Sequence, residues 1–460
     1  MKSTVPEKVT VTESLCPVCL EKIPARRVAV GDQVHLVKTC PAHGEWSTPI
    51  WRGPPDMEEW VGHGPDATCC GGPPQHIGAA PVTQGCPYDC GLCPDHGQST
   101  CTAVLEVTSR CNMRCPICFA DAGAASSSDD PPAAQLRAQL RDLMVAAGPV
   151  NIQFSGGEPT VREDLPLLVA AARDIGFTFI QINSNGLRLG REPGYAQVLR
   201  EAGAVSVFLQ FDGFAPAATE PIRGRAPLED KLRAVEHCAQ AGLAVVLVPT
   251  VVAGVNDREL GAIVRYAADM VPVVRGAHIQ PISYFGRFPA GKQPRLTLPE
   301  VLRALEEQTG GQVKPAHFSP SSCEHVLCSF RGRYWVRSGG RLEPFAFHAV
   351  PADSSLQSDC AELGPVSSAS RRAVAATARQ WSPPPARPGC SAEAADELER
   401  FLAGADRVLS ISGMLFQDVW NLDLERVRRC CVHALVPGRG RVPFCLWNLT
   451  SASGRRLYRS

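Results

Sequence analysis

Three cysteines stand close together in the segment Cys111-Asn-Met-Arg-Cys115-Pro-Ile-Cys118, directly after an apolar run typical of a β-strand (AVLEVT, 103–108). Thiolates at this spacing can bind three irons of a [4Fe–4S] cluster, which leaves the fourth iron without a nearby protein ligand. An open iron can bind a substrate or a cofactor, so this loop is the first candidate for a catalytic site. The spacing alone also allows a zinc knuckle, or a ferredoxin-type site without its fourth cysteine.

The next strand-like run (151–155) ends in a second motif, Ser155-Gly156-Gly157-Glu158-Pro159. Two glycines let the backbone approach a ligand closely, and the carboxylate that follows can accept hydrogen bonds from an ammonium group. On its own, this segment is a glycine-rich turn before a helix. In this order, the two motifs together resemble the radical S-adenosylmethionine (SAM) superfamily. The resemblance implies that the three cysteines hold a [4Fe–4S] cluster, that SAM chelates its open iron, and that the GGEP segment binds the SAM ammonium.

Polar residues at the ends of later strand-like runs are further candidates for the cofactor site. The resemblance implies that they line the bound SAM, and they are Ser184, Asn185, Gln210, Asp212 and Gln280. Each of them alone is also a common cap or turn residue. Parallel strands would bring all of them to one edge of a sheet.

Six strand-like runs alternate with six helix-like runs between residues 103 and 308. The strand-like runs are 103–108, 151–155, 177–183, 205–211, 244–252 and 276–282, and the helix-like runs are 133–147, 164–175, 194–202, 228–241, 257–270 and 297–308. This order predicts an α/β fold with a parallel sheet and right-handed crossovers, in the form of a partial (β/α)6 TIM-like barrel. A doubly wound sheet is the alternative.

The chain divides into three expected regions. Residues 1–100 are a Cys-rich metal-binding region with few periodic patterns, 101–310 form the radical SAM core barrel, and 311–460 form a C-terminal auxiliary-cluster region. Within the last region, the Ser, Ala, Arg and Pro content of 367–390 predicts a linker, and 394–404 predicts a helix.

The N-terminal region contains a candidate site for one metal ion. Cys16-Pro-Val-Cys19 and Cys40-Pro-Ala-His43 have the spacing of a tetrahedral zinc site or a rubredoxin-like iron site. The fourth ligand is either His43 or a cysteine at 69 or 70, and unliganded thiols are the alternative. The choice between iron and zinc stays open at this stage.

A second CxxxCxxC segment comprises Cys86, Cys90 and Cys93, and Cys101 follows eight residues later. Four cysteines complete a closed [4Fe–4S] cluster, so these predict an electron-transfer or structural cluster, with zinc as the alternative.

Another set of four cysteines comes from the C-terminal region, namely Cys323, Cys328, Cys431 and Cys445, and Cys430 could replace Cys431. The first two are more than 100 residues from the last two along the chain, so the pairs can meet only if this region folds back. They predict a further auxiliary cluster, with buried structural thiols as the alternative. Together the expected cofactors are a SAM-binding [4Fe–4S] cluster, SAM, one or two auxiliary [4Fe–4S] clusters, and one mononuclear iron or zinc.

Composition narrows the class of protein. The 460 residues contain 46 Lys and Arg against 46 Asp and Glu, and this balance argues against a nucleic-acid partner. The longest apolar run (243–255) is too short to span a membrane, and the first ten residues lack a signal-peptide core. We therefore expect a cytoplasmic protein, in which peripheral membrane contact is still allowed. Most of the 20 cysteines are then reduced and available to metals.

Five segments together resemble one particular group of the superfamily, namely CPVCLEKIPAR, KTCPAHGEW, GCPYDCGLCPDHGQSTC, TSRCNMRCPICFADAG and HALVPGRGRVPFCLWN. This group is typified by the archaeal tetraether lipid synthase, and its members are often labelled dihydropterin methyltransferases. The resemblance implies a 5′-deoxyadenosyl radical that abstracts hydrogen from an unactivated carbon, followed by carbon–carbon bond formation, as in lipid-chain coupling. It also implies an electron donor such as ferredoxin or flavodoxin and a small-molecule or lipid substrate.

Two other functions compete with lipid-chain coupling. One is a radical methyltransferase of a pterin or another small heteroaromatic, and the other is a non-catalytic cluster-binding maturation or redox protein. Long lipid chains would need an apolar channel, whose candidate linings are Phe285, Phe288, Phe318, Phe330, Trp335, Phe345 and Phe347. These aromatic residues could equally belong to the core.

Overall fold

The N-terminal part of the chain forms a separate small sheet. The structure, a computed structural model, describes residues 9–62, 82–123, 130–291, 294–321, 323–345, 368–383 and 407–459. The antiparallel N-terminal sheet comprises β1 (Val9–Leu15), β2 (Lys22–Val30), β3 (Gln33–Cys40) and β4 (Gly44–Arg52), and helix α1 (Met57–Gly62) follows. The expectation of few regular elements in residues 1–100 is therefore wrong for 9–52. These strands are largely half-exposed, so apolar alternation is weak there.

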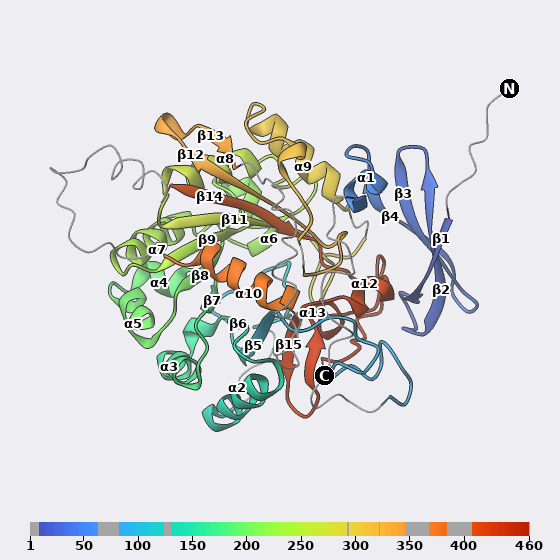
Figure 1. Ribbon diagram of the computed structural model, residues 1–460, viewed down its shortest axis with the longest axis horizontal. Coiled ribbons are helices and arrows are strands. Elements are labelled where there is room, and N and C mark those ends of the chain that lie inside the picture. Colours follow the sequence, from blue (N-terminus) through green and yellow to red (C-terminus); the bar gives the residue numbers. More distant parts are fainter. Residues whose placement is uncertain are drawn as a thin grey trace, which may run out of the picture.

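The predicted α/β fold with a parallel sheet is confirmed. Six consecutive parallel strands form the middle of a large sheet, namely β5 (Thr102–Thr108), β6 (Asn151–Gly156), β7 (Ile180–Ser184), β8 (Ser206–Gln210), β9 (Ala244–Val248) and β11 (Val274–Pro281). A short strand, β10 (Thr250–Val251), also pairs with β11. The sheet curves as in a partial barrel and carries its helices on the outside (Figure 1).

The helices follow the strands as the sequence predicts. They are α2 (Ala133–Ala147), α3 (Leu165–Ile175), α5 (Tyr195–Ala202), α7 (Leu228–Gln240), α8 (Leu260–Asp269) and α9 (Leu298–Gln308). Helix α9 illustrates the local reasons: Thr297 and Glu300 form a capping box at its start, and its apolar face is buried. Two short helices were not predicted, α4 (Leu187–Arg191) and α6 (Pro216–Arg223), and single 3-10 turns occur at η1 (Pro159–Val161), η2 (Pro315–His317) and η3 (Ser338–Gly340).

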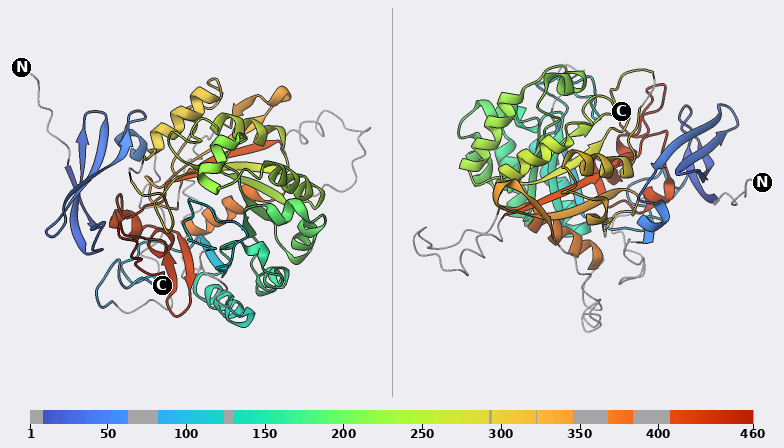
Figure 2. Two further views of the ribbon diagram at one scale, coloured as in Figure 1. Left: turned by 180° about the vertical axis from the view of Figure 1, so that it is seen from behind. Right: turned by 90° about the horizontal axis from the view of Figure 1, so that it is seen from above.

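The C-terminal part of the chain extends both edges of this sheet. Strand β14 (Val408–Met414) pairs in parallel with β11, and β15 (Val432–Val436) pairs in parallel with β5. The outer strands are antiparallel, namely β12 (Ser329–Val336), β13 (Leu342–Pro344) and β16 (Gly440–Pro443). Helices α12 (Leu424–Arg428) and α13 (Phe444–Trp447) lie in this part of the chain, between the large sheet and the N-terminal sheet (Figures 1 and 2).

The segment for which the sequence favoured a linker contains a helix, α10 (Ser368–Trp381). It lies on the inner side of the curved sheet, across from the outer helices (Figure 1). Trp381 stacks near Phe208 of β8, with ring centroids 5.5 Å apart. The linker prediction is therefore wrong for 368–381, because packing against the sheet stabilises a helix of modest apolar content. The expected helix at 394–404 lies outside the described residues.

Alternation along the central strands separates two environments. Ile152 and Phe154 of β6, like Ile180 and Ile182 of β7, belong to the apolar core under the outer helices. The side chains between them face the inside of the barrel and are amides. Within the residues that the structure describes, no helix is long and apolar enough to cross a bilayer.

Candidate active site and metal centres

A cavity of about 210 Å³ opens at the carboxyl ends of the parallel strands. The three cysteines of the first motif line it, together with Gly156, Gly157, Glu158, Ser184, Asn185, Gln210 and Gln280. The structure thus brings most of the expected cofactor residues to one space. Two expected residues, Pro159 and Asp212, are not part of its lining.

The cysteine loop joins the end of β5 to the cavity. Burial, with a smaller contribution from the neighbouring Glu158 carboxylate, raises the pKa of the Cys111 thiol to about 12. Burial also raises the pKa of the Cys115 thiol, and bound iron would supply the positive charge that favours the thiolate forms. Their arrangement therefore fits a cluster held by Cys111, Cys115 and Cys118.

Arg287 holds this loop in place through hydrogen bonds and an ion pair. Sequence reasoning missed this role. Its backbone exchanges two hydrogen bonds with Cys118, with N···O distances of 2.9 and 3.0 Å. Its guanidinium donates to the carbonyl oxygen of Cys115 at 2.7 Å and pairs with Asp121 at 3.0 Å. A lone arginine 169 positions after Cys118 gives no sequence signal of this role.

The glycine pair allows a close approach, but to the protein's own backbone. A Cβ on Gly157 would lie 2.1 Å from the carbonyl oxygen of Arg110, and a Cβ on Gly156 would lie 2.2 Å from that of Thr108. The amides of Gly157 and Glu158 donate to these same two carbonyls, at 2.8 and 2.9 Å. The glycines therefore hold the end of β6 against the start of the cysteine loop.

We expect Gly157→Ala to lower the SAM-dependent reaction rate by about 100-fold, because a shift of about 1 Å in a reacting geometry has this effect. The added methyl group meets backbone atoms that cannot rotate away, so the cysteine loop and β6 must separate. The measurement is 5′-deoxyadenosine release by the reconstituted protein. Gly62→Ala is the control, because a Cβ there meets no described residue within 4 Å. Equal rates for the two variants would contradict this account.

Glu158 is almost completely buried, at 1% exposed. One carboxylate oxygen, Oε1, accepts from the Thr160 amide and hydroxyl (3.2 and 2.6 Å) and from the Ser184 hydroxyl (2.8 Å). The other, Oε2, accepts from the Asn185 amide at 2.7 Å. Oε2 therefore keeps one acceptor position, which an ammonium group in the cavity could use. Burial raises the pKa of this carboxyl, and the hydrogen bonds oppose that shift.

Asp212 lies beneath the cavity wall in a buried ion pair with Arg223, whose Nε and Nη2 are 2.8 and 2.9 Å from the carboxylate. Arg223 does line the cavity. Next to this pair, Lys231 donates to the side-chain oxygen of Gln210 at 2.9 Å, and burial lowers the Lys231 pKa to about 8. Asp212 thus positions Arg223, and Lys231 positions Gln210.

The walls of the cavity differ in chemistry. Amides project from the strands, where Gln153 donates to Gln181 at 2.8 Å and Asn183 donates to Gln153 at 3.3 Å. Within the described part of the chain, Asn183 Oδ1 has no hydrogen-bond partner. Sequence reasoning missed Gln153 and Asn183, although polar and apolar residues alternate in NIQFS and at the end of FTFIQIN, which was a usable signal.

Aromatic side chains project into the cavity from the connecting segments, namely Phe119, Phe285, Phe416 and Phe444. Phe444 packs against Phe119 and Phe416, with centroids 5.6 and 4.8 Å apart. Of the expected channel residues only Phe285 lines the cavity. Phe318 and Phe330 belong to the core, Phe288 packs against an apolar cluster, Trp335 stacks on Phe345, and Phe347 lies outside the described residues.

The N-terminal sheet assembles a four-ligand site between its strands. The ligand atoms of Cys16, Cys19, Cys40 and His43 all lie within 4.8 Å of one another. His43 Nδ1 is 3.4 Å from Cys40 Sγ and 3.6 Å from Cys16 Sγ. This set of three thiols and one imidazole fits a tetrahedral metal ion, with His43 as the fourth ligand. Cys69 and Cys70 fall outside the described residues.

The structure divides the expected set of Cys86, Cys90, Cys93 and Cys101. The first three are buried and interact with one another, as the pKa of the Cys90 thiol is raised mainly by its contact with Cys86. Cys101 instead forms a disulfide with Cys323. Strand pairing places Cys101 among the C-terminal cysteines, because it precedes β5 and its amide donates to the carbonyl oxygen of Cys431 at 2.8 Å, beside β15.

The C-terminal cysteines fall into two groups on either side of the Cys430–Cys431 bond. One group is Cys101, Cys323 and Cys431, whose sulfurs lie within 4.8 Å of one another. The other is Cys328, Cys430 and Cys445, where burial raises each thiol pKa and neighbouring thiols raise those of Cys430 and Cys445 further. The expected set of Cys323, Cys328, Cys431 and Cys445 is thus divided between the groups. Since Cys101 and Cys323 form a disulfide, the group of three free thiols, Cys328, Cys430 and Cys445, is the one that suits an iron–sulfur cluster.

Comparisons with known proteins agree with this arrangement. The profile of the radical SAM superfamily matches residues 105–267, and the profile described as the HMPTM N-terminal zinc ribbon domain matches residues 9–52. The chain is 33% identical over 482 aligned positions to the 7,8-dihydro-6-hydroxymethylpterin dimethyltransferase of Methanocaldococcus jannaschii. This alignment covers 95% of this chain and 93% of that protein. The chain is also 35% identical over 143 positions to the Fe-coproporphyrin III synthase of Methanosarcina barkeri, in an alignment that covers 31% of this chain and 35% of that protein. Among solved structures, SuiB of Streptococcus suis covers 46% of each chain at 15% identity, with a TM-score of 0.39.

Proposed function

The chain belongs to the radical SAM superfamily, and we propose from this premise that it transfers a methyl group to a pterin or a similar small heteroaromatic. It is a radical SAM enzyme, so a non-catalytic maturation or redox role is set aside. The name of the Methanocaldococcus relative supports a pterin as the substrate, because that relative matches nearly the whole chain. A reductant such as ferredoxin or flavodoxin would supply electrons.

The amide wall of the cavity is the observation that carries this proposal. Gln153, Asn183, Gln210 and Gln280 present donors and acceptors there, and Asn183 Oδ1 is still unpaired in the described part of the chain. The edge of a pterin ring can pair with such groups. A hydrocarbon chain cannot, and it would bury each unpaired amide at a cost of about 1–3 kcal/mol.

The protein groups have separate roles in this proposal. A reduced cluster held by Cys111, Cys115 and Cys118 would supply the electron that cleaves the C–S bond of SAM. Glu158 holds Ser184 and Asn185 in place beside that loop. The aromatic side chains at the cavity mouth would exclude water from a reactive radical.

Three further sets of cysteines, one of them with His43, are proposed as auxiliary metal sites. The N-terminal sheet, as a zinc ribbon, would hold zinc at Cys16, Cys19, Cys40 and His43. Cys86, Cys90 and Cys93 would hold one auxiliary cluster. The group of Cys328, Cys430 and Cys445 would hold another, which we call the C-terminal cluster.

Carbon–carbon coupling of apolar chains is the second candidate function. The aromatic residues at the mouth of the cavity favour it, since Phe119, Phe285, Phe416 and Phe444 could contact a hydrocarbon. This candidate and the first use the same radical chemistry and differ in the group that accepts the new carbon.

The mass of the product separates the two candidates. The reconstituted protein is incubated without oxygen with dithionite, SAM as the radical source, a one-carbon donor that supplies the methyl group, and either 7,8-dihydro-6-hydroxymethylpterin or a glycerol diether lipid. We expect the pterin to gain one or two methyl groups, and the lipid to be unchanged. Coupled lipid chains with an unmodified pterin would instead support the second candidate, and 5′-deoxyadenosine release without either product would refute both.

We expect Asn183→Leu to raise the KM for the pterin by about 10- to 100-fold, because a buried ring N–H would lose its acceptor. SAM cleavage should change little, since Asn183 does not contact the cysteine loop in the described structure. The control is Gln181→Leu, which breaks the same ladder of amides one step away from the cavity. If both variants raise KM equally, the ladder matters only for the fold.

A further inference from the structure

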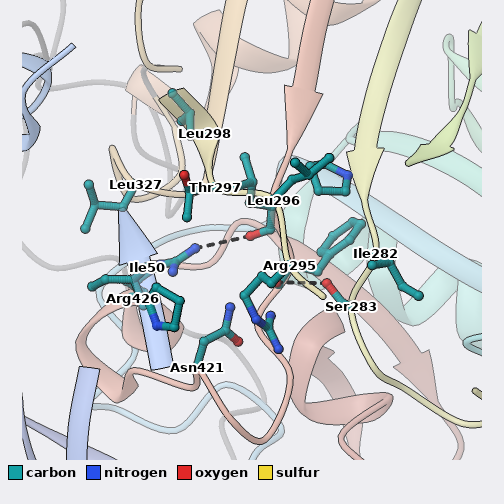
Figure 3. Close-up of a pocket in the computed structure, with 14 residues that line it drawn as sticks. Ile50, Ile282, Ser283, Arg295, Leu296, Thr297, Leu298, Leu327, Asn421 and Arg426 are labelled. Carbon is teal, nitrogen blue, oxygen red and sulfur yellow. Dashed lines mark hydrogen bonds between the residues drawn. The ribbon is translucent and has the colours of Figure 1, made fainter. Parts of the chain in front are cut away.

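Arg426 of helix α12 is a buried cation beside a cysteine of the C-terminal region. Arg426 is 5% exposed. Its Nη2 atom lies 3.3 Å from Cys328 Sγ and 3.1 Å from the Leu415 carbonyl oxygen. Figure 3 shows Arg426 at the edge of a small cavity of about 30 Å³, near Asn421 and Leu327. The arginine therefore points its charge at a sulfur atom from inside the protein.

Two carboxylates, those of Glu324 and Asp423, lie near enough to Cys328 to raise the pKa of its thiol, but neither is paired with Arg426 in the described structure. In the described ranges, no carboxylate lies within 4.0 Å of its guanidinium, and its Nε has no hydrogen-bond partner. The neighbouring Arg295 differs, because it is paired with Asp418 at 2.9 Å. A buried cation is costly unless an opposite charge is near, and a thiolate ligand of a cluster is such a charge. The position of Arg426 thus suits a metal-bound Cys328 better than a free thiol.

The N-terminal sheet fixes the helix that carries Arg426. Asp423 caps α12 by accepting from the Glu425 amide at 3.0 Å. The same carboxylate accepts from the Thr12 hydroxyl at 2.7 Å and pairs with Arg27 at 2.7 Å. Asp423 is 2% exposed, so this contact is shielded from water and from salt. Figure 2 shows α12 between the N-terminal sheet and the large sheet.

We propose that Arg426 is a positioning residue that sets the reduction potential of the C-terminal cluster through Cys328, and that Arg27 and Asp423 hold it in place. Reduction adds one electron and hence one negative charge, which a nearby cation stabilises. Hydrogen bonds to cluster sulfurs act in the same direction. This inference rests on the C-terminal cluster proposed above and is independent of whether a pterin or a lipid is the substrate.

The test is a redox titration of the full reconstituted protein, followed by electron paramagnetic resonance. All variants also carry Cys111→Ala, Cys115→Ala and Cys118→Ala, which removes the SAM-binding cluster from the spectrum. The signal that Cys328→Ser alters or removes identifies the C-terminal cluster. At a fixed applied potential, we expect Arg426→Gln to lower the ratio of reduced to oxidised C-terminal cluster at least about tenfold. This change corresponds to 59 mV for one electron.

Further variants separate a shift in potential from a folding defect. Arg426→Lys keeps the charge and should shift the ratio less, in the same direction, with a full complement of iron. Arg27→Gln should produce a smaller shift of the same sign, because it only loosens α12. Arg429→Gln is the matched control, as Arg429 is an exposed neighbour on the same segment.

Two results would overturn the proposal. One is an unchanged reduction potential of the C-terminal cluster in both Arg426 variants when their iron and sulfide contents equal those of the parent protein. The other is a spectrum and iron content that Cys328→Ser leaves unaltered, which would show that Cys328 binds no cluster. Neither result depends on product formation, so failure here is distinct from failure of the proposed methyl transfer.

Discussion

Replacing Cys111, Cys115 and Cys118 together with alanine should reduce 5′-deoxyadenosine release by at least about three orders of magnitude, to the level of the uncatalysed reaction. The reason is that SAM cleavage needs an electron delivered at the sulfonium, and these thiols are the only cysteines among the described residues that line the cavity. Iron content should fall by about four atoms per chain, the content of one [4Fe–4S] cluster.

The control for this variant is Cys238→Ala. Cys238 is buried in the apolar core on α7 and belongs to none of the cysteine groups. It should keep the full iron content and cleave SAM at the normal rate. The assignment of the active site would be wrong if the triple variant released 5′-deoxyadenosine as fast as Cys238→Ala does.

Asp212→Asn should lower the free energy of unfolding by about 3–5 kcal/mol, because it leaves the buried Arg223 guanidinium without its counter-charge. The Asp212 side chain is 0% exposed and that of Arg223 is 10% exposed, so water cannot replace the lost partner. Asp212 also accepts from the Thr250 amide at 3.0 Å, and the variant weakens this bond too. The measurement is the midpoint of denaturant-induced unfolding.

Asp174→Asn is the matched control for this prediction. Asp174 pairs with Arg173 at the surface, where the side chains are 66% and 48% exposed. Exposed pairs contribute about 0–1 kcal/mol, so its midpoint should barely move. Similar midpoints for the two variants would mean that Asp212 contributes little to stability.

The central six strand–helix units could be predicted because each one buries its own apolar stripe. Runs such as 151–155 and 177–183 place apolar residues under the helices at every second position. The edge strands β14 and β15 could not be predicted, since their pairing with β11 and β5 depends on segments far away in the chain. Helix α10 was missed for a related reason. The surface that stabilises it exists only once distant strands have formed the sheet.

The site was predictable where its residues are neighbours in sequence. The three cysteines of the Cys111–Cys118 motif and residues 155–158 of the second motif line the cavity, and the two motifs belong to consecutive strand ends. The grouping of distant cysteines was not predictable, as the place of Cys101 beside Cys431 follows from the pairing of β5 with β15. Phe416 and Phe444 likewise reach the cavity only through the fold.

The pairing of β15 with β5 also constrains how the protein is made. A ribosome finishes β5 more than 300 residues before it begins β15, so the edge of the barrel stays unpaired for most of synthesis. The same holds for the group of Cys101, Cys323 and Cys431, whose last member emerges with that strand. Contacts this far apart in sequence close slowly. Iron delivered while the nascent chain is still growing could occupy the Cys111 loop, whereas the proposed C-terminal cluster could form only in a chain that is almost finished.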